Sequence, residues 1–169
     1  MDTSMTTFSN WAGSVTAQPS EFLQPSRIDE IPDIITRSRS VRTVGAGHSF
    51  SPVAAGEGTM MNLDKLSGLV GVDKQRKRVR FLAGTRLRDV PKLLRPFGLA
   101  LANQGDVDPQ SLAGAISTST HGTGLNYTGF AGTVTGLTLI DADGNTRTYS
   151  LDEDPDLLRL IVVSIGALG

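Results

Sequence analysis

The chain has 169 residues, enough for one ordinary domain or for two small subdomains that share a core. Its composition (38% hydrophobic, 20% charged) is typical of a soluble globular protein, and a net charge of −1 without a block of one sign argues against nucleic acid or an anionic membrane as the main partner. The absence of cysteine excludes disulfides, thiolate chemistry and cysteine-based metal sites, and two histidines without zinc-motif spacing give no reason to expect any metal.

The first part of the chain predicts an N-terminal arm followed by a strand and a helix. The arm carries the only tryptophan, Trp11, and is therefore expected to pack back onto the protein. Residues 21–25 are a strand candidate. Ser26 or Asp29 could cap the helix, and we prefer Asp29, because Pro32 then lies in the first turn, where its missing N–H has no intrahelical partner. The helix is expected to end near Ser40.

The N-terminus shows no cationic region followed by an apolar one, and no stretch approaches 18 apolar residues. We therefore expect a cytoplasmic protein without a membrane span.

Residues 41–52, the next segment, organise the rest of the chain. A β-branched run, Val41 to Val44, predicts a buried strand, and Thr59 to Leu63 predicts a third strand of a small parallel unit. Between them lies Gly45-Ala46-Gly47-His48-Ser49-Phe50-Ser51. Its two glycines allow a tight turn that exposes consecutive N–H groups, as in loops that hold phosphate.

Two known phosphate loops do not fit this segment. A dinucleotide-binding fingerprint needs a third glycine and a long helix, which Phe50 and Pro52 would interrupt. A Walker loop needs Gly-Lys, and no glycine in the chain precedes a lysine. The segment is thus a nucleotide-loop candidate of another kind, or else a glycine-rich surface turn that happens to contain a histidine.

Residues 69–73 and 77–83 predict a hairpin around a charged turn, which we interpret as solvated rather than as a phosphate track. Residues 86–95 predict a short amphipathic helix that stops before Gly98. Residues 134–141 and 146–149 predict a second hairpin, and Pro155 opens a final helix. The strongly apolar end of the chain predicts that this is the front part of a longer protein.

A second unusual stretch runs from Ser111 to Gly124, where only Leu112, Ile116 and His121 have sizeable side chains. So many small residues let another backbone or a flat ligand approach closely, and the Ser and Thr hydroxyls offer neutral donors to phosphates or ring carbonyls. The alternative is tight helix packing followed by a flexible loop.

Five motifs in this order resemble the vanillyl-alcohol-oxidase type of flavoprotein, in its aldonolactone and alditol oxidoreductase branch. They are Asn10–Gly13, Gly45–Phe50, Gln104–Ser111, Thr120–Gly124 and Ser164–Gly169. The resemblance covers nearly the whole chain, and the block that begins at Gln104 favours bacterial lactone dehydrogenases over alditol oxidase.

The resemblance implies an α+β fold, a PCMH-type FAD-binding domain of two α+β subdomains with FAD clasped between them. One subdomain has a small parallel β-α-β sheet, and the other has a larger mixed sheet flanked by helices. In this chain they would be residues 18–73 and an incomplete 74–169, after an arm of residues 1–17.

In the family, the loop equivalent to Gly45–Ser51 wraps the pyrophosphate, and the histidine aligned with His48 is often bonded covalently to the 8α-methyl carbon of the flavin. The second stretch lines the flavin ring and the rest of the cofactor. The implied FAD-binding residues are Gly45, Ala46, Gly47, His48, Ser49, Phe50, Ser51, Ser111, Gly114, Ser117, Ser119, Thr120, His121, Gly122 and Gly124. His121 could instead be structural, donating to a backbone carbonyl.

The implied activity is oxidation of a sugar-1,4-lactone (gulono-, galactono- or arabinono-type) or a related polyol by hydride transfer to FAD, with oxygen or another acceptor reoxidising the flavin. Catalytic residues are expected in a cap domain that this segment lacks, so the segment alone should not turn over. Alternatives are an alditol oxidase, noncovalent FAD, or a non-catalytic nucleotide-binding module. A serine hydrolase built on Ser49 or Ser119 is disfavoured, because the chain has no Gly-x-Ser-x-Gly elbow.

Overall fold

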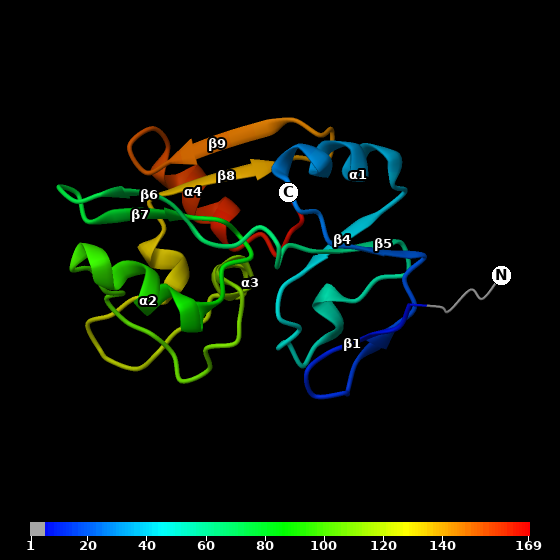
Figure 1. Ribbon diagram of the computed structural model, residues 1–169, viewed down its shortest axis with the longest axis horizontal. Coiled ribbons are helices and arrows are strands. Elements are labelled where there is room, and N and C mark those ends of the chain that lie inside the picture. Colours follow the sequence, from blue (N-terminus) through cyan, green and yellow to red (C-terminus); the bar gives the residue numbers. More distant parts are fainter. Residues whose placement is uncertain (1–5) are drawn as a thin grey trace.

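The structure is a computed structural model that describes residues 6–169. Figure 1 shows its elements in two groups that lie side by side. The arm begins one group and folds as a short antiparallel hairpin of β1 (Phe8–Ser9) and β2 (Thr16–Ala17). Within residues 6–169, no helix has the length and apolar character needed to cross a membrane.

A parallel sheet forms the centre of the first group. Its strands are β3 (Glu21–Leu23), β4 (Val41–Val44) and β5 (Thr59–Asn62), in the order β3-β5-β4. This confirms the predicted parallel unit and puts its last strand in the middle, where all four residues are buried. Because the strands are parallel, the segments that follow β4 and β5 leave the sheet at the same edge.

Helix α1 (Ile31–Arg37) covers this sheet, and its start differs from the prediction. Asp29 is not the cap: it lies in a 3-10 turn, Ile28–Glu30, and Glu30 occupies the N-cap position without a side-chain capping bond. The reason is a competing partner, because the Asp29 carboxylate is paired with the Arg27 guanidinium. Pro32 nevertheless lies in the first turn, as expected. The helix stops at Arg37 rather than near Ser40.

The second group contains the remaining elements. Gly98, in the left-handed conformation (φ +68°), ends the helical segment that contains Val90–Leu94, where the sequence predicted the stop. Asp154 caps the last helix, Pro155–Val162, by accepting from the Leu157 N–H. The elements are β6 (Leu69–Asp73), β7 (Arg78–Phe81), α2 (Val90–Leu94) flanked by 3-10 turns at Leu87–Asp89 and Arg95–Phe97, α3 (Leu112–Ser117), a 3-10 turn at Phe130–Thr133, β8 (Gly136–Ile140), β9 (Thr146–Ser150) and α4 (Pro155–Val162).

Both hairpins of this group form as predicted, but they do not join into the larger mixed sheet that the resemblance implied. β6 pairs only with β7, and β8 pairs only with β9, among the strands of residues 6–169. The physical reason is that the described part of the chain supplies no strand to bridge their outer edges. The group is therefore two antiparallel hairpins with helices between and beside them (Figure 1).

The turn of the β8–β9 hairpin ties the two groups together. The Asp141 carboxylate accepts a hydrogen bond from Arg147 and others from the backbone N–H groups of Asn145 and Asp143. These bonds, that of Arg147 first, hold the pKa of Asp141 below its usual range. Gly144, at the tip of the turn, lies against Pro32 of α1.

Two buried clusters hold the groups in place. One contains Ile31 and Ile34 of α1, Met61 of β5 and Leu66, with Ile140 of β8 packed against it. Strand β8 thus completes the core of the first group. The other contains Leu87, Ala115 and Phe130, with Leu112 and Ile116 of α3 packed against it. This second cluster supports the small-residue stretch that begins at Ser111.

Candidate functional site

The first predicted stretch, residues 45–51, leaves the sheet at the carboxyl end of β4. Asn62, the last residue of β5, is buried, and its Nδ2 donates to the carbonyl oxygens of Gly45 (3.2 Å) and Val44 (3.4 Å). Gly47 has a φ of +67°, a left-handed conformation that favours glycine. The neighbouring strand therefore anchors the start of the loop, and Gly47 provides its turn.

The backbone of this loop offers donors. From Ala46 to Ser51, no N–H group finds an acceptor among residues 6–169. Gly47, His48 and Ser49 are half-buried, whereas Ser51 is exposed and the Phe50 side chain is 71% exposed. A row of unpaired N–H groups at the end of a parallel strand is suited to binding an anion such as a phosphate.

The arm packs on this loop, as the position of its tryptophan suggested. The Asn10 side chain donates to the Ser49 carbonyl (2.9 Å), and the backbone N–H of Trp11 donates to the Gly47 carbonyl (2.9 Å). The Trp11 indole also stacks on the His48 imidazole. The sequence analysis did not include Asn10 and Trp11 among the site residues. The presence of the only tryptophan at position 11 was nevertheless a signal that could have pointed to them.

The second predicted stretch meets the first at its beginning. Ser111 is buried and caps α3, since its Oγ accepts from the Gly114 N–H (3.2 Å). A Cβ added to Gly45 would lie 2.3 Å from the Ser111 Oγ and 3.6 Å from the Gly114 Cα. A side chain at position 45 would therefore displace the Ser111 hydroxyl that caps α3.

Beyond α3, the stretch from Ser117 to Gly124 forms a loop pinned at Thr120. The Thr120 N–H donates to the Ala115 carbonyl (2.9 Å), and the Thr120 carbonyl accepts from the Phe130 N–H (2.9 Å). The N–H groups from His121 to Gly124 have no acceptor within the described residues. Ser119 adopts a positive φ of +53°. Most of this loop faces solvent with unused donors.

His121 has the local bond that its structural interpretation required. Its side chain is exposed, and Nδ1 donates to the Gly122 carbonyl (2.9 Å). That bond fixes the ring against its own loop. It also means that Nδ1 carries the proton in this arrangement.

Not all of the predicted residues meet one another. Gly45, Ser111 and Gly114 are in contact, but Gly47 lies against Phe8 and Asn10 of the arm. Gly122 lies instead against Asn103 and Gln104. The two stretches thus meet at their beginnings, and their later residues have different neighbours.

A polar link that sequence reasoning missed joins the same two regions. Arg86 pairs with Asp64, just after β5, and its Nη1 donates to the Pro109 carbonyl (2.9 Å). Gln110 Nε2 donates to the Thr120 Oγ1 (3.2 Å). Asp64 Oδ1 and Gln110 Oε1 are buried without a donor from the described residues. Such acceptors are costly to leave unpaired, so they are suited to donors from a ligand.

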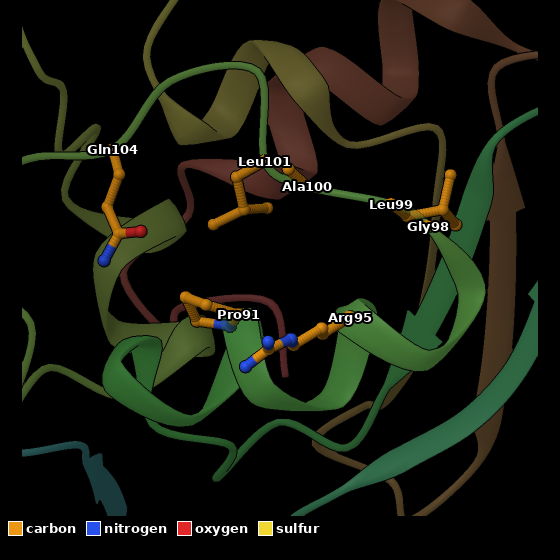
Figure 2. A pocket seen from close by; sticks show the side chains of 7 residues that line it. All are labelled: Pro91, Arg95, Gly98, Leu99, Ala100, Leu101 and Gln104. Atoms are coloured by element: carbon orange, nitrogen blue, oxygen red, sulfur yellow. The ribbon is translucent and has the colours of Figure 1, made fainter.

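A pocket in the described residues is lined by another part of the chain. It has a volume of about 380 Å³, and its lining contains none of the residues predicted to bind the cofactor. Figure 2 shows Pro91 and Arg95 on the α2 segment facing Leu101 and Gln104 across it. Within residues 6–169, no three or more histidine, aspartate or glutamate residues are grouped so that they could bind a metal ion.

Comparison with known proteins agrees with the resemblance seen in the motifs. Residues 19–150 match the family described as FAD binding domain. The chain is 39% identical to L-gulono-1,4-lactone dehydrogenase of Mycobacterium tuberculosis over 166 residues, which are 96% of this chain and 38% of that protein.

Two further relatives are lactone oxidases. The chain is 34% identical to D-arabinono-1,4-lactone oxidase of Candida glabrata over 170 residues, 96% of this chain and 32% of that protein. It is 34% identical to L-gulonolactone oxidase of Mus musculus over 166 residues, 96% of this chain and 38% of that protein. The chain therefore spans less than two fifths of the length of these curated relatives.

Proposed function

The chain belongs to the FAD binding domain family, and from this we propose that it is the cofactor-binding part of an oxidoreductase that oxidises a sugar-1,4-lactone by hydride transfer to FAD. The observation that carries the proposal is the row of unpaired N–H groups from Ala46 to Ser51, beside the contact of Gly45 with Ser111. The similarity to a lactone dehydrogenase and to lactone oxidases supports the choice of substrate class.

The residues present fit FAD. The N–H groups of Ala46–Ser51 would bind its pyrophosphate, and the free N–H groups and hydroxyls of Ser117–Gly124 would face the flavin and its ribityl chain. The two orphaned acceptors, Asp64 Oδ1 and Gln110 Oε1, would accept from donors of the cofactor. FAD supplies the two-electron acceptor that no side chain can provide. Neutral donors near the ring would stabilise the negative charge of its reduced form.

We further propose that FAD is bound covalently through His48, with noncovalent FAD as the alternative. His48 would lose its ring N–H proton as the nitrogen bonds to the 8α-methyl carbon, which also loses a proton, and dioxygen would take the electron pair left on the flavin. The half-buried position of His48 and its fixed contact with Trp11 support this assignment.

We assign residues 18–73 and 74–169 to two FAD-binding subdomains that follow an arm of residues 1–17. Residues 69–73, at the end of the first subdomain, pair with β7 of the second, and Asn10 and Trp11 of the arm pack on the loop of the first. The catalytic base would come from a domain outside this segment. Dioxygen or another carrier would reoxidise the flavin, the protein would act in the cytoplasm, and nucleic acid would not be a partner.

Reduction of the bound flavin by substrate tests this function. Under anaerobic conditions, L-gulono-1,4-lactone or D-arabinono-1,4-lactone should bleach the visible flavin absorption of the full-length protein, because the hydride reduces the ring. Bleaching by alditols alone would replace the lactone proposal with an alditol oxidase. A protein that binds FAD and is bleached by neither class would be a non-catalytic nucleotide-binding module.

A further inference from the structure

The indole of Trp11 covers one face of the His48 imidazole. The two ring centroids are 5.2 Å apart, and the ring planes differ by only 17°. Phe50 meets the same indole edge-on, with centroids 6.4 Å apart. Trp11 is nevertheless 68% exposed, so burial of the indole in a core does not explain its position.

Hydrogen bonds on both sides of His48 hold the indole in place. The backbone N–H of Trp11 donates to the carbonyl of Gly47, the residue before His48 (2.9 Å). The Asn10 side chain donates to the carbonyl of Ser49, the residue after it (2.9 Å). Two hydrogen bonds, to the residues before and after His48, therefore hold the arm against the loop at this point.

The Asn10 side chain is itself held in place by hydrogen bonds within the arm. It is only 6% exposed, and besides the bond to the loop its Nδ2 donates to the Ser14 hydroxyl (3.1 Å). Its Oδ1 accepts from the Val15 N–H (3.0 Å). Every polar atom of the Asn10 side chain is engaged, which fixes its rotamer and so the place where the arm crosses the loop.

From this geometry we propose that Trp11 is a positioning residue for His48: its indole restricts the imidazole to one orientation in which the ring can meet the flavin. The proposal rests on the proposed role of His48 in holding FAD. A histidine side chain without such a neighbour distributes over roughly three χ1 wells and two χ2 orientations. Removing the indole should therefore lower the fraction of molecules with a productive imidazole orientation about sixfold.

The test compares four forms of the full-length protein: the native protein, Trp11→Ala, Trp11→Phe and the control Ile28→Ala. Each is prepared without flavin and mixed with FAD, and acid-stable flavin fluorescence is followed over time. Trp11→Ala should incorporate FAD about sixfold more slowly, as one orientation in six remains productive. Trp11→Phe keeps an aromatic face and should restore most of the rate. Ile28→Ala, which removes another exposed apolar side chain, is the control and should match the native protein.

A second measurement needs no flavin. The His48 ring-proton NMR signals should lie upfield in the native protein and in Trp11→Phe, because they feel the aromatic ring current, and should move downfield in Trp11→Ala. Unchanged signals in Trp11→Ala would overturn the inference, as would a native rate of incorporation in that variant. If the native protein binds FAD only noncovalently, the proposed linkage fails, and the NMR signals alone decide whether Trp11 positions His48.

Discussion

The His48→Ala variant of the full-length protein should release all of its FAD on acid precipitation, whereas the native protein should retain FAD in the pellet. The reason is that His48 is proposed to supply the only nitrogen that bonds to the flavin, and alanine has no nucleophilic atom. In the native protein, flavin fluorescence should appear on the tryptic peptide of residues 43–65, which contains His48.

His121→Ala is the matched control, because His121 is the only other histidine in the chain. Its imidazole is bonded to the Gly122 carbonyl, so its loss should leave the acid-stable flavin unchanged. Acid-stable flavin that persists in His48→Ala, or that maps to the peptide of His121, would refute the attachment at His48.

Gly45→Ala is expected to produce the second large effect, on stability and on FAD binding together. The new Cβ would lie 2.3 Å from the Ser111 Oγ, too close for either atom to stay in place. Such overpacking costs about 1–3 kcal/mol. The thermal unfolding midpoint should fall, and the protein should incorporate less FAD, because the shift moves the cap of α3 away from the loop.

Two variants isolate the cause of this effect. Gly71→Ala is the control, since a Cβ there, on β6, meets no atom within 4 Å. In the double variant Gly45→Ala/Ser111→Ala the clashing hydroxyl is absent and the nearest Ser111 atom, its Cβ, is 3.5 Å away. The double variant should therefore be less destabilised than the sum of the single variants. Equal stability of Gly45→Ala and Gly71→Ala would mean that the two stretches do not meet at Gly45.

The elements that local sequence determines were predictable. Both hairpins carry alternating patterns around turns rich in Asp, Gly or Lys, and Pro155 and Gly98 mark a helix start and a helix end by their own backbone preferences. The predictions were wrong where two partners compete for the same side chain. Asp29 had the right chemistry for a cap, but Arg27 offers its carboxylate a charged partner.

Each half of the candidate site was visible in the sequence from its own composition. The contact between Gly45 and Ser111 was not, because it depends on how β4 and α3 are placed by two separate cores. The same holds for the pair of Asp64 and Arg86, which are far apart in the chain and whose charges alone predict only solvated side chains. As the only tryptophan, Trp11 was expected to pack on the protein, but only the structure shows that it stacks on His48.

The claim on which the rest depends is that FAD occupies the region formed by residues 45–51 and 111–124. A crystal structure of the full-length protein grown with FAD tests it most directly. We predict the pyrophosphate within hydrogen-bonding distance of the N–H groups of Ala46–Ser51, and the flavin ring against Ser117–Gly124. FAD bound instead in the pocket beside Arg95 and Gln104, or a protein that takes up no FAD, would contradict the account.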